Sequence, residues 1–222
     1  MPSRRGKLLE NCDTLMLDMD GTLLDLAFDN YFWLQLVPVE YARRQRMPEH
    51  QAREQLYARM RALQGTLDWY CLDYWTEILD MDIAGMHRDA NDRIGYLPGA
   101  ESFLEHVTVS GVRMLLVTNS HRTTLDIKNE VTNVTRFFDE IYTSHDVGHA
   151  KEDQPFWESV SALENFDPDR TMFIDDNLDV LRSAKTFGVK YLIAVAQPDT
   201  TAPVRDVVGY PAVDRVANLM PG

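Results

Sequence analysis

The sequence predicts an α/β fold: a Rossmann-like parallel sheet with helices on both faces, and an all-helical cap inserted between its first two strands. Two observations predict this arrangement. Through the C-terminal two-thirds of the 222 residues, apolar segments of strand length alternate with longer segments of helical spacing. Such alternation indicates strands joined by helices, and therefore a parallel sheet covered on both sides. A long interval of helical spacing alone separates the first strand from the second.

The expected elements of the core follow one another closely along the chain. The first strand, "TLMLDMD" at 14–20, is apolar until it reaches two acids, and a Gly-Thr follows directly. One helix begins after Gly99, and the last ends at Gly188, in keeping with the usual glycine at a helix C-terminus. The other expected strands are residues 112–120, 139–144, 170–177 and 190–198, and the other expected helices are residues 122–132, 153–165 and 178–188.

The inserted interval, residues 27–83, has helical spacing throughout. Pro48 marks the start of one helix and Gly65 a break between helices. We therefore expect a core domain formed by residues 1–28 and 95–222 and a helical cap domain formed by residues 29–94. The Pro-rich tail from Gln197 onward is expected to form a loop with short irregular elements.

Composition limits the partners and the location of the protein. The net charge of −13 argues against DNA or RNA, whose phosphate backbone requires a basic face. Apolar runs are too short to cross a bilayer, and residues 1–13 lack the apolar segment of a secretory signal. Cys12 and Cys71 make no disulfide framework, and we expect both to be buried thiols in a reducing compartment. A cytoplasmic protein with no membrane or nucleic-acid partner fits best, and the oligomeric state stays open.

Polar residues follow the first four expected strands. In open α/β sheets the ligand site lies at the carboxyl ends of the strands, so we expect these residues to converge at one edge. The groups are Asp18 and Asp20 at the end of the first strand, Thr118, Asn119 and Ser120 at the end of the second, Lys151 in the loop after the third, and Asp175 and Asp176 at the end of the fourth.

These residue types suit phosphoryl chemistry. Four carboxylates in one small site cannot all stay ionised without a cation, and oxygen ligands with room for water suit Mg²⁺. Lys151, the Thr118 hydroxyl and the backbone N–H groups of Asn119 and Ser120 are suited to hold phosphate oxygens. An aspartate can attack phosphorus covalently, and a carboxylate two residues away can serve as general acid and then base. The expected partner is a small-molecule phosphate ester.

Four short motifs, in this order along the chain, resemble the haloacid dehalogenase-like (HAD) superfamily of phosphohydrolases. They are "DMDGT" at 18–22, "TN" at 118–119, "AKEDQPFW" at 150–157 and "IDDN" at 174–177. The resemblance implies that Asp18 is the nucleophile and Asp20 the acid/base, and that Thr118, Asn119 and Lys151 grip the phosphate. It further implies that Mg²⁺ is held by the side chains of Asp18 and Asp176 and the backbone carbonyl of Asp20, with Asp175 acting directly or through water.

A closer resemblance is to bacterial purine 5′-nucleotidases of this superfamily. It is carried by "LDMDGTLLDLAFDNYFW", "TLDWYCLDYW" and "AKEDQPFW", which belong to both core and cap. It implies a Mg²⁺-dependent phosphomonoesterase that hydrolyses purine nucleoside 5′-monophosphates (GMP, IMP) through an aspartyl-phosphate. Cap residues that we expect near the substrate are Asn30, Tyr31, Trp69, Tyr70 and Tyr74.

Other activities remain to be weighed against this one. A phosphatase or phosphomutase acting on sugar phosphates or other small phosphate esters would keep every core motif, and only the cap would differ. A dehalogenase needs no such acid cluster, and a phosphonatase needs a cap lysine, which is absent between Lys7 and Lys128. A binding module without catalysis would show a substitution in one of the four groups, and none is found.

A histidine pair in "SHDVGHAK" also invites a metal interpretation. His145 and His149 lie in a loop with Asp146, but no third strong ligand accompanies them in the sequence. Polar surface is therefore the favoured interpretation over a zinc site.

Overall fold

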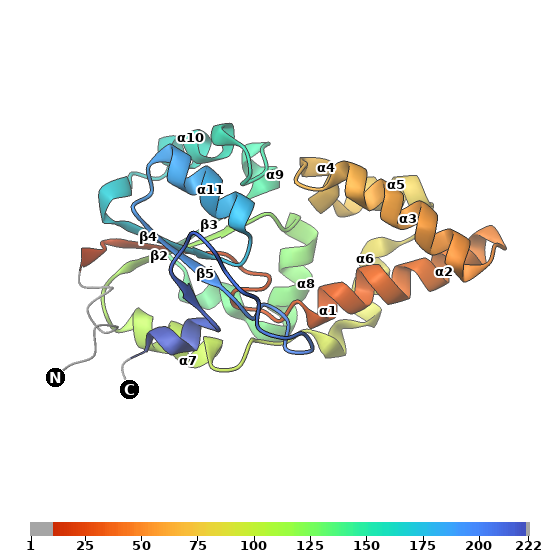
Figure 1. Ribbon diagram of the computed structural model, residues 1–222, viewed down its shortest axis with the longest axis horizontal. Helices are drawn as coiled ribbons and strands as arrows, with labels where there is room; N and C mark the ends of the chain where they lie inside the picture. Colours follow the sequence, from red (N-terminus) through yellow and green to blue (C-terminus); the bar gives the residue numbers. More distant parts are fainter. Residues whose placement is uncertain (1–10, 221–222) are drawn as a thin grey trace.

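A six-stranded parallel sheet forms the centre of the core, in the order β3-β2-β1-β4-β5-β6 (Figure 1). The computed structural model describes residues 11–220. Residues 1–10 lie outside this range. The predicted start of the core domain, and most of the segment in which no secretory signal is expected, therefore fall outside the described residues. The strands are β1 (Thr14–Leu17), β2 (Arg113–Thr118), β3 (Glu140–Thr143), β4 (Thr171–Asp175), β5 (Tyr191–Val195) and β6 (Ala212–Val213).

Strand β1 lies at the middle of the sheet and is buried on both faces. Leu17 pairs with Leu116 of β2 on one side and with Ile174 of β4 on the other. Alternate β1 side chains belong to different hydrophobic clusters: Leu15 and Leu17 to one, Met16 to the other. Strands covered on both faces are apolar throughout rather than alternating, which is why this strand was recognisable in the sequence.

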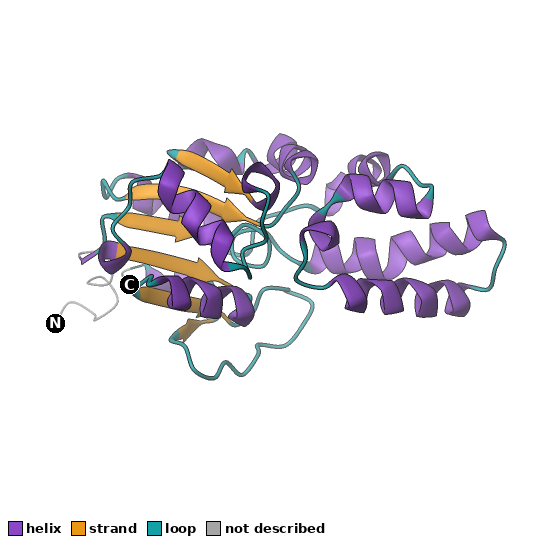
Figure 2. Ribbon diagram, turned by 90° about the horizontal axis from the view of Figure 1, so that it is seen from above, coloured by secondary structure: helices purple, strands orange, loops and turns teal. Residues whose placement is uncertain are grey.

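Helices cover both faces of the sheet, as the sequence predicts (Figure 2). On one face Phe103 of α7 and Leu125 of α8 pack into the cluster that contains Leu15. On the other face Trp157 of α10 and Leu181 of α11 pack around Met16. The core helices are α7 (Ala100–Thr108), α8 (Arg122–Thr132), α9 (Ser144–Val147), α10 (Gln154–Leu163) and α11 (Leu178–Phe187), with 3-10 turns η4 (Val134–Phe137) and η5 (Pro168–Arg170).

The cap is helical and has its own hydrophobic cluster. Phe32, Leu56 and Trp75 are buried in it, and Ile127 of core helix α8 joins them, so the cap packs on that helix. Helix α3 begins directly after Pro48, and Gly65 takes a positive φ of 80° after that helix has ended. The cap elements are α1 (Ala27–Tyr31), the π-helix η2 (Phe32–Leu36), α2 (Val37–Gln45), α3 (Glu49–Leu63), α4 (Leu67–Tyr70), α5 (Leu72–Leu79), α6 (Ile83–Asp89) and the 3-10 turn η3 (Asn91–Arg93).

The C-terminal tail folds back on the core. It is mostly irregular, as expected, but it adds the short edge strand β6 and the 3-10 turn η6 (Val216–Leu219). Its Arg205 reaches the carboxyl end of β4 and donates to the Asp176 backbone oxygen at 2.8 Å. Within residues 11–220, no helix combines the length and apolar character that crossing a bilayer requires.

The two cysteines differ in their surroundings. Cys12 is buried in the core as expected. The expectation of a buried thiol is wrong for Cys71, which is only half-buried at the junction of α4 and α5. Its sulfur lies near His121 and His145 of the core, outside the hydrophobic cluster of the cap.

Candidate active site

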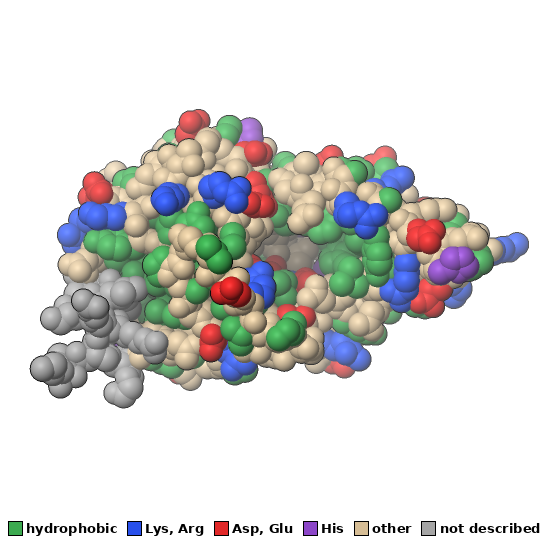
Figure 3. Space-filling view, in the orientation of Figure 1, with side chains coloured by type: hydrophobic (Ala, Val, Ile, Leu, Met, Phe, Trp, Pro, Cys, Tyr) green, Lys and Arg blue, Asp and Glu red, His purple; other side chains and the backbone are tan. Residues whose placement is uncertain are grey.

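The polar residues expected at the strand ends do converge at one edge of the sheet. They line a cleft of about 380 Å³, which opens where core and cap meet (Figure 3). We call it the carboxylate cleft. The residues that line it include Asp18, Asp20, Thr118, Asn119, Ser120, Lys151, Asp175 and Asp176.

Lys151 lies at the centre of the cleft and is almost fully buried. Its ammonium donates to Asp18 Oδ1 at 2.5 Å, to Asp175 Oδ2 at 2.7 Å and to the Val117 carbonyl at 3.1 Å. One ammonium thus joins the ends of three neighbouring strands. Because the surroundings exclude water, these charge-assisted bonds fix the positions of both carboxylates.

Asn119 holds the Lys151 segment in place through its side chain. Its Oδ1 accepts from the Lys151 backbone N–H at 2.8 Å, and its amide donates to Glu152 Oε2 at 2.9 Å. Thr118 Oγ1 accepts from the Ser120 backbone N–H at 3.0 Å. The loop after β2 is therefore organised by its own side chains, and the phosphate-binding role of Thr118 and Asn119 stays a prediction.

The carboxylates of Asp18, Asp175 and Asp176 form a compact group of oxygen donors, with one oxygen of each within 4.8 Å of the others. Asp175 is committed on both sides, since Lys151 donates to Oδ2 and the Asn177 N–H donates to Oδ1 at 2.7 Å. Among residues 11–220, the Asp176 carboxylate receives only a long 3.4 Å contact from Arg205. These hard, closely spaced donors fit a divalent cation such as Mg²⁺, and Asp176 has more lone pairs to offer than Asp175.

Gly21 allows the chain to turn directly behind the acids. Strand β1 ends at Leu17, earlier than predicted, and the backbone reaches a φ of +84° at Gly21. A Cβ there would lie 2.8 Å from the Asp176 carboxyl carbon, closer than real side chains pack. A glycine is therefore required both by the positive φ and by the approach of Asp176.

Burial is the main cause of the raised pKa values of the acids in the cleft. It raises the pKa of Asp18 to about 8, with Lys151 acting in the opposite direction and Asp175 and Asp20 adding to the rise. Burial likewise raises the pKa of Asp176 to about 7, and Asp18 adds to that shift. Burial works against the Lys151 ammonium, but its two carboxylate partners outweigh it and raise the pKa of Lys151. The cleft therefore holds more carboxyl groups than one ammonium can keep ionised.

A second buried lysine, Lys128 of α8, was missed in the sequence. Its ammonium donates to Asp20 Oδ1 at 2.7 Å and to both oxygens of Asp29, in cap helix α1, at 2.7 and 2.8 Å. Asp20 Oδ2 accepts from Ser120 Oγ at 2.6 Å. The signal was present: on α8, Lys128 lies midway between Thr124 and Thr132, on the buried face of the helix.

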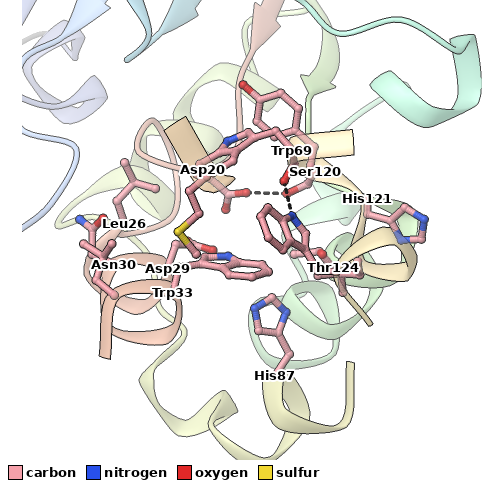
Figure 4. A pocket seen from close by; sticks show the side chains of 15 residues that line it. Asp20, Leu26, Asp29, Asn30, Trp33, Trp69, His87, Ser120, His121 and Thr124 are labelled. Atoms are coloured by element: carbon pink, nitrogen blue, oxygen red, sulfur yellow. Dashed lines mark hydrogen bonds between the residues drawn. The ribbon is translucent and has the colours of Figure 1, made fainter. Parts of the chain in front are cut away.

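An apolar cavity of about 250 Å³ adjoins the carboxylate cleft on the cap side (Figure 4). We call it the aromatic cavity. The expected substrate residues Asn30, Trp69 and Tyr70 line it, and so does Trp75, another aromatic residue of the same cap segment. Trp33 also lines it and was not singled out. The other two expected residues lie elsewhere. Tyr31 stacks beneath the Arg93 guanidinium at 4.0 Å beside a separate hollow, and Tyr74 packs edge-on against Trp75.

His87 of α6 is an unusual member of the cavity wall. It is 1% exposed, and its ring centroid lies 3.8 Å from that of Phe32. Among the described residues, neither of its ring nitrogens has a hydrogen-bond partner. Burial, and then the charge of Lys128, lower the pKa of His87 to about 3, so the ring is neutral. In Figure 4 it lies across the cavity from Asp20. A buried neutral imidazole without partners is costly to the fold and available to a ligand.

The two hollows adjoin and share part of their walls. Asp20, Leu26, Tyr70 and Ser120 line both of them. Tyr70 also donates to Glu152 Oε1 at 2.6 Å, which holds cap helix α4 against the core. One ligand can therefore place a charged group in the cleft and an apolar group in the cavity.

Comparison with known proteins places this architecture in a family. The model of haloacid dehalogenase-like hydrolases matches residues 12–188. The chain belongs to the haloacid dehalogenase-like hydrolases. The expectation of an enzyme, a hydrolase of phosphoric monoesters, is thereby confirmed, as is the predicted fold.

Particular relatives of this HAD-like hydrolase share its whole length. It is 37% identical to the GMP/IMP nucleotidase YrfG of Escherichia coli (strain K12) over 96% of each chain. A HAD phosphatase from Thermococcus onnurineus superposes with a TM-score of 0.77 at 18% identity, covering 93% of this chain and 95% of the other. L-2-haloacid dehalogenase from Xanthobacter autotrophicus gives a TM-score of 0.63 at 16% identity, with coverages of 94% and 96%. At these identities the two solved structures show the fold alone.

Replacing Lys128 by methionine should destabilise the hydrolase by about 2–4 kcal/mol, because two partly buried carboxylates lose their shared, buried cation. Chemical denaturation monitored by circular dichroism measures this change. Lys185→Met, on the exposed face of α11, is the matched control and should change stability by less than about 1 kcal/mol. Adding Asp29→Asn to Lys128→Met should restore part of the loss. Equal denaturation midpoints for Lys128→Met and the wild type would contradict a stabilising role for the Lys128 ion pairs.

Mg²⁺ should bind more tightly as the pH rises from about 6 to about 8. The pKa of Asp18 is about 8 and that of Asp176 about 7, so at lower pH both carry protons that the cation must displace. Calorimetry in two buffers of different ionisation enthalpy measures both the affinity and the protons released.

Asp176→Asn should weaken this binding and reduce the proton release. Asp179→Asn, an exposed acid in the first turn of α11, should leave both unchanged. An affinity that does not vary over this pH range, with no proton released, would show that these carboxyls do not take up the cation.

Proposed function

We propose that this HAD-like hydrolase is a Mg²⁺-dependent phosphomonoesterase that hydrolyses purine nucleoside 5′-monophosphates, GMP and IMP, through an aspartyl-phosphate. The observation that carries the proposal is that the carboxylate cleft adjoins the aromatic cavity and shares Asp20, Tyr70 and Ser120 with it. A nucleotide has the matching polarity, with a doubly charged phosphate at one end and a flat heterocycle at the other.

Asp18 is the proposed nucleophile. Its carboxylate attacks phosphorus, so a bond forms between a carboxylate oxygen and phosphorus while the bond from phosphorus to the 5′-oxygen breaks. Lys151, at 2.5 Å, fixes the orientation of Asp18 and offsets the charge of the incoming phosphate. Thr118 Oγ1 and the backbone N–H groups after β2 are the proposed phosphate donors.

Asp20 is the proposed acid and base. It gives a proton to the departing 5′-oxygen, so the nucleoside leaves as an alcohol. It then takes a proton from the water that attacks the aspartyl-phosphate, which releases inorganic phosphate and restores Asp18. Ser120 and Lys128 hold the two Asp20 oxygens, at 2.6 and 2.7 Å, and so fix the direction in which the carboxyl points.

The metal would be held by Asp18, Asp176 and the backbone carbonyl of Asp20. When bound, Mg²⁺ supplies positive charge to the phosphoryl oxygens as charge builds up during transfer. This assignment is supported by the oxygen donors of Asp18, Asp175 and Asp176, which lie within 4.8 Å of one another.

The aromatic cavity is the proposed site of the purine. Trp33, Trp69 and Trp75 provide flat apolar surfaces for a base to stack on. His87 is the group with hydrogen-bonding capacity left over, and a purine edge carries both donors and acceptors. The name of the 37%-identical relative, a GMP/IMP nucleotidase, supports the choice of base. We also propose a cytoplasmic location, supported by a sequence with only two cysteines, too few for a disulfide framework.

Phosphate release across a panel of substrates tests the proposal. With Mg²⁺, GMP and IMP should exceed glucose phosphates roughly tenfold or more in kcat/KM, since the latter leave the aromatic cavity unfilled. Chelation by EDTA should abolish release. Asp18→Asn should remove detectable turnover and keep the fold, whereas Asp179→Asn should behave as the wild type. If glucose phosphates exceed GMP and IMP, the nucleotidase proposal fails.

The variant His87→Leu measures how much a hydrogen bond between His87 and the base contributes to kcat/KM. Loss of one hydrogen bond should lower kcat/KM for GMP about 3- to 10-fold. Hydrolysis of p-nitrophenyl phosphate, which has no purine edge, should be unchanged, and the melting temperature should not fall because an unpaired polar group has been removed. His50→Leu, on the exposed surface of α3, is the matched control. An unchanged kcat/KM for GMP would exclude His87 from base recognition.

A further inference from the structure

A second group of metal-binding side chains lies at the boundary between cap and core, outside the carboxylate cleft. Cys71 comes from the junction of cap helices α4 and α5, His121 precedes core helix α8, and His145 belongs to core helix α9. One donor atom of each lies within 4.8 Å of the other two. We call these three residues the soft-ligand cluster. The sequence suggested different companions for His145, namely His149 and Asp146, and gave no indication of Cys71.

We propose that Cys71, His121 and His145 form a binding site for a transition-metal ion of the Zn²⁺ class, and that the bound ion ties the cap to the core. A thiolate and two imidazoles are a common donor set for zinc, with water or a carboxylate as the fourth ligand. Tetrahedral zinc spaces such donors roughly 3.3–3.8 Å apart, so the cluster needs to contract by about 1 Å.

His145 already has the protonation pattern of a metal ligand. The Ser144 hydroxyl donates to the Asn119 carbonyl at 2.9 Å, so at 3.2 Å it can only accept from His145 Nδ1. Nδ1 therefore carries the proton and Nε2 the lone pair. Nε2 is buried and, within the described part of the chain, has no hydrogen-bond partner.

His121 is held loosely and is supported by a carboxylate. Its Nδ1 accepts from the Thr123 N–H at a long 3.4 Å, and its Nε2 lies 3.8 Å from Asp73 of the cap. A metal at Nδ1 would replace the long contact while Nε2–H continues to face Asp73. This is the carboxylate–histidine–metal arrangement common in zinc proteins. The His121 and His145 rings pack edge to face, with centroids 4.7 Å apart.

Cys71 is accessible and lies at a helix N-terminus. Its sulfur accepts from the Tyr74 backbone N–H at 3.4 Å, in the first turn of α5. The neighbouring Tyr70 bonds to Glu152 of the core, so the segment is already drawn toward the core. Both Tyr70 and His121 line the aromatic cavity. An ion here would therefore fasten the cap at the wall of that cavity.

The two candidate metal sites select different ions. Soft sulfur and imidazole nitrogen favour Zn²⁺ and Co²⁺, whereas the oxygen donors of the carboxylate cleft favour Mg²⁺. The soft-ligand cluster does not rest on the proposed nucleotidase activity, since it is defined by donors outside the carboxylate cleft.

Cobalt spectroscopy tests whether the site binds metal. Titration of the full-length, metal-free protein with Co²⁺ should give a thiolate-to-cobalt charge-transfer band and intense tetrahedral d–d bands that saturate at one equivalent. Zn²⁺ should displace the Co²⁺. Cys71→Ser should abolish the charge-transfer band, and His145→Ala should weaken Co²⁺ binding tenfold or more. His149→Ala, an exposed neighbour, and Asp176→Asn, in the other cluster, should leave the band intact.

Absence of a charge-transfer band at saturating Co²⁺ would contradict the proposed metal site. So would a band that survives in Cys71→Ser, because the thiolate would then be Cys12. Circular dichroism spectra that superpose for the variants and the wild type confirm that the change is local.

Inhibition by Zn²⁺ tests the tie between cap and core. At saturating Mg²⁺, Zn²⁺ should slow hydrolysis of p-nitrophenyl phosphate by the wild type and by His149→Ala. Cys71→Ser should be markedly less sensitive to Zn²⁺, with unchanged activity in its absence. Equal inhibition of Cys71→Ser and the wild type would show that Zn²⁺ inhibits by binding in the carboxylate cleft. It would contradict the proposal that a metal ion ties the cap to the core.

Discussion

Two buried ammonium groups hold together a site that is otherwise acidic. Lys151 joins Asp18 to Asp175, and Lys128 joins Asp20 to Asp29. A buried charge is tolerated only when it is paired, so each lysine determines where its two carboxylates can lie. With Asp176 included, the carboxyl groups still outnumber these cations. That excess is the physical reason for expecting a divalent cation at the same edge of the sheet.

The two lysines differ in what they connect. Lys151 acts within the core, where it joins the ends of β1, β2 and β4. Lys128 reaches out of the core, because Asp29 belongs to cap helix α1 while Asp20 follows β1. The position of the cap and the orientation of the proposed acid/base therefore depend on one ammonium. This connection gives the cap an influence on chemistry that is independent of its contacts with a substrate.

Three kinds of surface meet where cap and core face each other. Hard oxygen donors line the carboxylate cleft, aromatic rings line the cavity beside it, and sulfur and imidazole donors lie at the boundary near Tyr70. Each kind favours a different class of partner: a hydrated divalent cation with phosphate, a flat apolar group, or a softer metal. The cap supplies much of the second and part of the third, while the first is formed mostly by the core.

The sequence by itself determined the sheet, the order of its helices and the residues at the strand ends. Apolar runs, turn residues and acids at strand ends are local signals, and parallel strands bring their carboxyl ends to one edge. Only the tertiary structure revealed Lys128, His87 and the pairing of Cys71 with His145. Periodicity indicates which face of a helix is buried but not which side chain of another helix faces it. For this reason Trp33 lines the cavity whereas Tyr74 does not, although both lie in similar aromatic segments.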